Sequence, residues 1–340
     1  MEFRHRQLGL SDETVLEMYE MMCLARNVDE RMWLLNRAGK IPFVISCQGQ
    51  EGSQVGAAFA LDRKKDYCLP YYRDVGVVLS FGMTARDILL AAFGKAEDPN
   101  SGGRQMPNHW GQRKNRIVTG SSPVATQVPH AVGFALAAKI EKKDFVTLVS
   151  LGEGSSNQGD FHEGLNFAGV HKLPVVILVE NNKYAISVPE SRQLACKRVS
   201  DRAIGYGMPG YTVDGSDVLE VYRVMKEAVE RARAGGGPSL IETLNYRFTS
   251  HSSDDDDRTY RDEEERREAK RHDPILKFKA YLEGVGLLEP EKEASIRQKI
   301  ETLVDEATEY AERAPYPKPE DALKYVYKEG GRDRDAIDLY

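Results

Sequence analysis

The sequence predicts an α/β fold: a doubly wound, mostly parallel sheet with helices on both faces, plus N-terminal helices and a helical C-terminal appendage. Apolar runs at 145–151 and 173–179 have the length and β-branched content of strands buried on both faces. Between them, residues 157–172 place apolar side chains on one helical face, so the three segments form a βαβ unit. A helix over 214–237 then leads into another strand at 239–248.

The N-terminal third of the chain is predicted to be helical. Residues 1–10 are expected to form a mobile arm, after which Ser11 caps a helix that stops at Gly39. The pattern predicts two further helices, at 49–60 and 84–94.

The loops and the C-terminal region complete the predicted organisation. Residues 95–121 are rich in Gly and Asn and lack periodicity, which favours a functional or mobile loop. Residues 125–140 form a nearly all-apolar helix, which should be buried. Residues 253–273 are strongly charged, and two or three amphipathic helices follow up to about residue 328. No linker precedes them, so we expect one domain over 11–340, with C-terminal helices from about residue 260 as an appendage.

Composition excludes several classes of function. The chain has 340 residues and a formal net charge of −6, so no global basic field attracts nucleic acid or an anionic membrane. The apolar runs are too short to span a membrane, and the N-terminus lacks the apolar core of a secretion signal. The cysteines are scattered without a C-x-x-C pair, which is typical of reduced thiols in a cytoplasmic protein.

A candidate phosphate site follows the first strand of the βαβ unit. Gly152 and Gly154 permit close approach of a ligand, and the next helix presents free N–H groups; a tight turn with nothing bound is the alternative. Asn157 breaks the dinucleotide pattern G-x-G-x-x-G, and the chain contains no P-loop. Glu153 would repel a diphosphate unless a cation lay between them, which indicates Mg²⁺.

A second polar group follows the next strand. "VVILV" ends in Glu180, Asn181 and Asn182, and parallel strands end at the same edge of a sheet. Glu153 and Asn182 can therefore converge, with the backbone carbonyl of Tyr184 as another oxygen ligand, while Asn181 shapes the turn.

These residues resemble a known cofactor motif. "GEG", followed after 26 residues by "NN", is similar to the thiamine diphosphate motif, usually written G-D-G…N-N, with Glu153 in place of Asp. The segments "LPYYRDVGVVLSFG", "GGRQMPNHWG", "TGSSPVATQVPHAVG" and "HSSDDDDRTYR" resemble α subunits of decarboxylating, lipoyl-linked 2-oxo acid dehydrogenases. The resemblance covers roughly residues 12–328 and is strongest to bacterial branched-chain members, which implies the thiamine-diphosphate-binding fold.

The resemblance implies roles for individual residues. Glu153, Asn182 and the Tyr184 carbonyl occupy metal-ligand positions. Tyr72 and Arg73 match a pair that binds the diphosphate, although a surface salt bridge between Arg73 and Asp74 is the alternative reading. The other implied cofactor-binding residues are Gly152, Gly154, Ser155, Ser122 and Val124, the last two beside the middle of the cofactor and its aminopyrimidine ring. Some relatives hold K⁺ near this loop, through Ser121, Pro123, Thr126 and Gln127; a plain turn is the alternative.

His251 matches an active-site histidine that assists acyl transfer to lipoamide, although a solvated loop histidine is the alternative. Arg247 is expected to face the same site, and His109 is a further candidate. Glu180 departs from relatives with Arg before the two asparagines, and its role is open. Ser252 matches a phosphorylated position of mitochondrial relatives, a regulation not expected in this chain, and the aspartates 254–257 are expected to be solvated and mobile.

The resemblance also implies partners. Family members obtain the glutamate that activates the cofactor and a second histidine from a β subunit, in assemblies of two α and two β chains. A lipoyl-bearing dihydrolipoyl acyltransferase core is the next partner, and a branched-chain 2-oxo acid the expected substrate. The alternatives are the α subunit of a pyruvate or acetoin dehydrogenase, a nicotinamide oxidoreductase using Glu180 on a ribose, and a phosphate-binding assembly subunit without activity.

Overall fold

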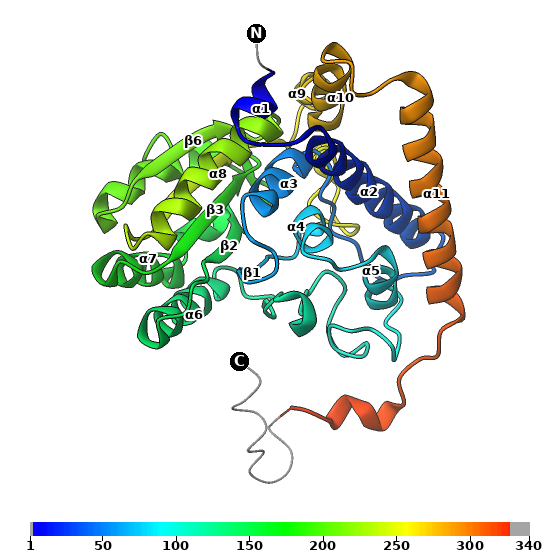
Figure 1. Cartoon of the computed structure of the whole chain (residues 1–340). Helices are drawn as coiled ribbons and strands as arrows, with labels where there is room; N and C mark the ends of the chain where they lie inside the picture. Colours follow the sequence, from blue (N-terminus) through cyan, green and yellow to red (C-terminus); the bar gives the residue numbers. More distant parts are fainter. Residues whose placement is uncertain (1–2, 327–340) are drawn as a thin grey trace.

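A five-stranded parallel sheet forms the centre of the molecule in the computed structural model, which describes residues 3–326 (Figure 1). The strand order is β1-β2-β3-β7-β6, and every neighbouring pair runs parallel. The strands span β1 Tyr67–Leu69, β2 Thr147–Gly152, β3 Val175–Asn181, β6 Gly210–Asp214 and β7 Ser239–Leu244. The predicted βαβ unit is confirmed as β2, the helix α7 Gly159–His171 and β3.

Helices cover both faces of the sheet, as the doubly wound prediction requires (Figure 1). One face packs on α6 Gln127–Glu141 and α7, and the other on α8 Val218–Arg233. The side chains of β3 alternate between two separate cores: Val175, Ile177 and Val179 join the first, whereas Val176 and Leu178 join the second. A strand buried on both faces must be continuously apolar, which explains the run that ends at Glu180.

The larger core extends through helices at the N-terminal side of the chain. α2 Asp12–Arg37 begins at Ser11, whose side chain accepts a hydrogen bond from the N–H of Thr14 at 3.2 Å, as predicted. α3 Glu51–Phe59 and α5 Ala85–Ala92 match two predicted helices. β1, α4 Val75–Ser80 and β6 were not predicted, because β1 has only three residues and β6 is largely exposed, so neither shows a clear apolar pattern.

The mobile arm expected over residues 1–10 differs from the structure of residues 3–10; residues 1–2 are not described. Residues Arg4–Gln7 form the short helix α1, and the His5 ring is fully buried. Its Nδ1 lies 2.7 Å from the Tyr281 hydroxyl and its Nε2 lies 2.8 Å from Asp12. Arg4 pairs with Asp217 at 2.8 Å. These long-range contacts hold the segment against the domain.

The helix α6 is buried on one side, whereas its apolar composition predicted burial on all sides. Its inner face packs on the sheet through Val128, Ala131 and Ala135, whereas Ile140 is 71% exposed. Gly133 and Ala137 on the outer face are exposed as well, so an all-apolar sequence here does not mean burial on all sides.

The C-terminal helices are α9 Glu263–Lys270, α10 Pro274–Gly284 and α11 Pro290–Arg313. α11 packs along α2 and α5 (Figure 1), and Phe278, Leu282 and Val304 belong to the same buried cluster as α2. Residues 327–340, the end of the predicted domain, lie outside the described part. The smaller elements are β4 Tyr184–Ala185, β5 Val188–Pro189 and the 3-10 turns Arg113–Asn115, Glu153–Asn157, Glu190–Arg192, Val199–Tyr206, Asp257–Thr259 and Pro319–Leu323.

No helix within residues 3–326 combines the length and the apolarity that crossing a lipid bilayer would need. The cysteines are free thiols, three of them buried, as predicted from their spacing.

Candidate active site

Four neighbouring strands deliver polar residues to one edge of the sheet. β1 is followed by Tyr72 and Arg73, β2 by Glu153, β3 by Asn182, and β7 by Arg247. Because the strands are parallel, all of these residues lie beyond the carboxyl ends, where α/β sheets bind ligands.

The predicted metal ligands are brought together at the ends of β2 and β3. Glu153 is 1% exposed, and its Oε2 accepts a hydrogen bond from the N–H of Asn182 at 3.1 Å. Burial raises the pKa of the Glu153 carboxyl. The Asn182 Oδ1 accepts from the N–H of Tyr184 at 3.3 Å, which brings the turn back toward Glu153. One carboxylate, one amide oxygen and one carbonyl are a hard oxygen set suited to Mg²⁺.

Two glycines flank Glu153 with different consequences. A Cβ on Gly154 would lie 2.5 Å from the Cβ of Ala185, so a glycine is needed for the β4 turn to close on the strand end. A Cβ on Gly152 would meet only the Tyr71 ring, at 4.0 Å. Packing in this chain therefore explains Gly154, whereas at Gly152 space remains for a ligand. Ser155, in the turn that follows, is buried.

Two buried arginines lie next to this group. Arg73 is 1% exposed and Arg247 is 0% exposed. Within residues 3–326, neither has a carboxylate within ion-pair distance, so the predicted alternative of an Arg73–Asp74 salt bridge is wrong. Arg73 donates to the carbonyls of Ser46 and His251, and Arg247 to the carbonyl of Ile186 at 2.9 Å. Burial and the charge of Arg73 lower the pKa of Arg247 to about 10.

His251 lies between the two guanidinium groups. Its Nδ1 is 3.4 Å from Arg73 Nη2 and 3.5 Å from Arg247 Nη1, and its ring meets the Tyr72 ring edge to face at 6.1 Å. Because both neighbours only donate, Nδ1 accepts and the proton lies on Nε2. Burial and the two positive charges lower the pKa of His251 to about 3, so the imidazole is neutral at physiological pH. The alternative of a solvated loop histidine is wrong.

The 121–127 segment leads into α6. The Ser122 hydroxyl is 2.5 Å from Nε2 of His109, and Val124 is half-buried. Among the residues predicted near K⁺, Ser121 donates to the Pro123 carbonyl at 2.7 Å, and Thr126 directly precedes α6. Gln127 donates to the Ser150 carbonyl at 3.0 Å, while its buried Oε1 has no donor in the described part of the chain. A neutral amide oxygen of this kind is a suitable ligand for a hard cation.

Glu180 does not reach the site. Its side chain is fully buried and turns toward α3 and the β1 loop, where Oε2 accepts from Gln54 Nε2 at 3.0 Å and from the Tyr71 hydroxyl at 3.3 Å. It also forms a carboxyl–carboxyl hydrogen bond with Asp74. Burial, followed by the charge of Asp74, raises the pKa of Glu180 well above its usual range. A ribose could not reach this carboxyl, so its proposed use in nicotinamide binding is wrong.

The aspartates 254–257 were expected to be solvated, but two of them organise the loop. Asp255 Oδ2 accepts from the N–H of His251 at 2.7 Å and from the Tyr260 hydroxyl at 2.5 Å. Asp257 is 9% exposed and pairs with Arg261, which also donates to the carbonyl of Thr249 at 2.7 Å. Ser252 is buried as well. Sequence reasoning missed these roles because four adjacent aspartates show no pattern that distinguishes buried from solvated members.

Sequence reasoning also missed the residues that hold the site together. Gln193 reaches Glu153 at 3.4 Å, and Trp110 donates from its indole N–H to the Tyr71 carbonyl at 3.1 Å. Asn108, which has a positive φ of 66°, donates to the Ile45 carbonyl at 3.2 Å. A buried Trp within the aperiodic 95–121 segment was the available signal that part of this loop is anchored.

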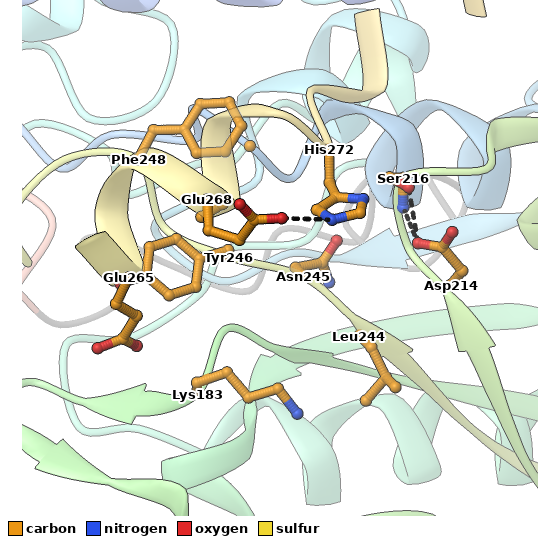
Figure 2. Close-up of a pocket in the computed structure, with 12 residues that line it drawn as sticks. Lys183, Asp214, Ser216, Leu244, Asn245, Tyr246, Phe248, Glu265, Glu268 and His272 are labelled. Carbon is orange, nitrogen blue, oxygen red and sulfur yellow. Dashed lines mark hydrogen bonds and ion pairs between the residues drawn. The ribbon is translucent and has the colours of Figure 1, made fainter. Parts of the chain in front are cut away.

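A cavity of about 400 Å³ lies beside the ends of β6 and β7 and is lined on one side by α9. Figure 2 shows the residues that line it. His272 Nε2 lies 3.8 Å from Glu268 Oε1 on its wall, and Lys183 and Asp214 face it from the strand ends. None of the predicted cofactor or metal residues lines this cavity, so it is distinct from the candidate site.

The fold and the site define an α/β protein with a buried carboxylate–amide cluster and a buried arginine pair at the carboxyl edge of its sheet. Comparison with known families gives the class: the chain belongs to the dehydrogenase E1 component family, whose pattern matches residues 19–320.

Relatives agree over nearly the whole chain. The 2-oxoisovalerate dehydrogenase subunit alpha of Bacillus subtilis (strain 168) is 67% identical over 324 residues, 95% of this chain and 98% of the relative. The 3-methyl-2-oxobutanoate dehydrogenase subunit alpha of Mycobacterium tuberculosis (strain CDC 1551 / Oshkosh) is 40% identical over 96% of this chain and 86% of its own length. The pyruvate dehydrogenase E1 component subunit alpha of Staphylococcus aureus (strain Mu50 / ATCC 700699) is 36% identical, over 94% and 84%.

Proposed function

We propose that this chain is the α subunit of a branched-chain 2-oxo acid dehydrogenase, which decarboxylates these acids oxidatively and transfers the acyl group to lipoamide. The 67% identity to a 2-oxoisovalerate dehydrogenase subunit, against 36% to a pyruvate dehydrogenase subunit, supports the branched-chain substrate. The observation that supports the site most strongly is the pair of buried arginines, which have no carboxylate partner within residues 3–326 and lie beside the candidate metal ligands. Buried cations of this kind require an anion, and a diphosphate supplies one.

The residues present fit thiamine diphosphate and Mg²⁺. Glu153, Asn182 and the Tyr184 carbonyl would hold the metal ion, and a divalent cation would offset the cost of burying the Glu153 carboxylate. Arg73 and Arg247 would bind diphosphate oxygens, together with Tyr72 and backbone groups at Gly152, Gly154 and Ser155. Ser122 and Val124 would line the rest of the cofactor. K⁺ at Gln127 is supported by its unpartnered buried Oε1.

Thiamine diphosphate supplies, when bound, the carbon nucleophile and the electron sink that decarboxylation needs. The chain's own contribution is positional and electrostatic. His251 keeps a proton on Nε2 and a lone pair on Nδ1, so it can donate to an oxygen of the acyl group at neutral pH without carrying a charge. The two arginines keep it in this state.

We further propose that the active site is completed by a β subunit in an assembly of two α and two β chains. A lipoyl-bearing acyltransferase core would accept the acyl group, and the complex would act in the cytoplasm. The candidate residues of this chain would bind the diphosphate and metal end of the cofactor, and the relatives are named as α subunits, which supports a partner chain that completes the site.

The experiment that tests this function reconstitutes the chain with its β subunit and a lipoylated acyltransferase domain. We expect the highest kcat/KM with 3-methyl-2-oxobutanoate, and lower values with pyruvate and acetoin. A preference for pyruvate or acetoin would reassign the substrate within the family. Robust turnover by the isolated α chain would overturn the shared active site.

A further inference from the structure

At the end of β3, the side chains of Glu180 and Asn182 point in different directions. Asn182 joins Glu153 at the metal clamp, whereas Glu180 turns away and is fully buried. A buried glutamate that contacts neither ligand nor solvent is costly, so its contacts must explain its presence.

Those contacts all lead to one segment, residues 71–76, which we call the diphosphate arm because it carries Tyr72 and Arg73. Glu180 Oε2 accepts from Gln54 Nε2 at 3.0 Å, and the same nitrogen donates to the Arg73 carbonyl at 3.1 Å. The Oε1 of Gln54 accepts from the N–H of Gly76 at 2.9 Å. Glu180 Oε2 therefore orients the Gln54 amide, which forms hydrogen bonds with two backbone groups of the arm, the Arg73 carbonyl and the Gly76 N–H.

A second path runs directly from Glu180 to the arm. The Tyr71 hydroxyl lies 3.3 Å from Glu180 Oε2, and Asp74, which is hydrogen-bonded to the Glu180 carboxyl, accepts from the N–H of Tyr71 at 3.0 Å. A glycine at position 76 is needed for this contact, because a Cβ there would lie 2.9 Å from the Cβ and Oε1 of Gln54. The close fit of α3 against the start of α4 is what lets Gln54 reach both partners.

We propose that Glu180 is a positioning residue that fixes the diphosphate arm relative to the metal clamp, so that Arg73 and the metal ligands are held at a set separation. The two ends of a metal diphosphate need such a separation, because a displacement of the arm moves Arg73 away from phosphate oxygens while the metal ion stays on Asn182. This role rests on the proposed function and names a determinant of cofactor affinity within it.

The test uses the α chain assembled with its β subunit at saturating Mg²⁺. It compares Glu180→Leu, which removes every polar contact, with Glu180→Gln, which keeps the shape and the hydrogen-bonding positions. We expect Glu180→Leu to raise the KM for thiamine diphosphate about tenfold to a hundredfold, as expected when buried hydrogen-bond partners are lost. The kcat at saturating cofactor should stay within about threefold, because no reacting group is removed. Glu180→Gln should restore the KM to within about threefold of wild type.

Asp66→Leu provides the matched control. Asp66 is equally buried and hydrogen-bonded, but it lies at the opposite edge of the sheet, directly before β1. We expect this variant to lower the melting temperature and leave the KM for thiamine diphosphate unchanged. An equal rise of KM in Asp66→Leu would make the effect of Glu180 a general loss of stability and would overturn the proposal.

Tyr71→Phe covers the case in which Glu180→Leu does not fold. It removes only a hydroxyl and should raise the KM for thiamine diphosphate about twofold to fivefold. Its effect should persist in a Glu180→Gln, Tyr71→Phe double variant, because the Glu180→Gln side chain keeps an oxygen that accepts from the Tyr71 hydroxyl. Unchanged KM in Glu180→Leu or in Tyr71→Phe, or a Glu180→Gln variant as impaired as Glu180→Leu, would overturn the positioning role. Wild-type protein that binds no thiamine diphosphate would instead overturn the proposed function.

Discussion

The two edges of the central sheet treat buried charge in opposite ways. At the amino edge, Asp66 is fully buried, accepts from the N–H of Val146 at 2.8 Å and pairs with Arg233 at 2.7 Å. At the carboxyl edge, Arg73 and Arg247 are just as buried, yet within residues 3–326 they contact carbonyls, His251 and a tyrosine hydroxyl rather than carboxylates.

This difference separates a structural use of charge from a ligand-binding one. In a buried ion pair with complementary hydrogen bonds, each charge is compensated by its partner, and removing one partner lowers the stability of the protein. Two buried cations that repel each other lower stability in the absence of an anion, so their retention points to a bound anion. We therefore expect variants at the carboxyl edge to change cofactor binding or the pH dependence of stability, and variants at the amino edge to change stability alone.

The largest effect is expected for Glu153→Ala. The substitution removes the one carboxylate of the metal clamp, and loss of a direct ligand should exceed the tenfold to hundredfold typical of outer partners. We therefore expect Mg²⁺-dependent affinity for thiamine diphosphate, measured by calorimetry, to fall by more than about a hundredfold. Glu153→Asp, which keeps a carboxylate, should retain affinity to within about tenfold. Unchanged affinity in Glu153→Ala would refute the metal assignment.

Arg73→Met sharpens the contrast between the edges. Removing one of two repelling buried cations should leave the melting temperature of the cofactor-free protein unchanged or higher, because the repulsion on Arg247 disappears. Affinity for thiamine diphosphate should nevertheless fall about tenfold to a hundredfold, since a charge-assisted bond to phosphate is lost. A variant that lost stability but kept its affinity would show that Arg73 is a structural residue.

Asp66→Asn tests the other edge. The amide keeps the shape of the side chain but removes the charge opposite Arg233, whose side chain is 24% exposed and thus partly solvated. We expect a loss of about 2 kcal/mol in the free energy of unfolding, by chemical denaturation, with cofactor affinity unchanged. A drop in cofactor affinity as large as that of Arg73→Met would remove the distinction between the edges.

The sequence could predict the carboxyl edge because parallel topology alone brings strand ends together. The apolar runs of β2 and β3, with one crossover helix between them, were enough to place Glu153 beside Asn182. The same reasoning could not anticipate Asp66 and Arg233, which are 167 positions apart and show no motif. Whether such a pair forms depends on how helix α8 packs on the sheet, because Arg233 is the last residue of that helix.

Glu180 marks the limit of reading a motif along the chain. The sequence left its role open. Alternation along β3 puts the Glu180 side chain on the same face as Val176 and Leu178. Whether that face held solvent or Gln54 at this position depended on α3, from a distant part of the sequence. The buried state of Asp257 among four adjacent aspartates was hidden for the same reason, since only its contact with Arg261 distinguishes it.

The smallest expected effect is a pH dependence that belongs to the carboxyl edge. The folded-state pKa of His251 is lowered to about 3 by burial and by the charges of Arg73 and Arg247, whereas an unfolded histidine titrates near 6.5. Between these values the unfolded chain binds a proton that the folded chain does not, so stability falls as the pH drops below about 6.5. The raised pKa of the Glu180 carboxyl acts in the opposite direction, because the unfolded chain loses a proton above about 4.5 that the folded chain retains.

The contribution of the histidine is isolated by comparing the stability of wild type with that of His251→Asn. From pH 7 to pH 5, wild type should lose about 1 kcal/mol more than His251→Asn, after allowance for solvent screening, or roughly 2 °C in melting temperature. Inorganic diphosphate with Mg²⁺ should shrink this gap, because an anion between the arginines removes the repulsion that keeps His251 neutral. Parallel pH profiles for the two proteins, with or without diphosphate, would show that the arginines do not control the imidazole.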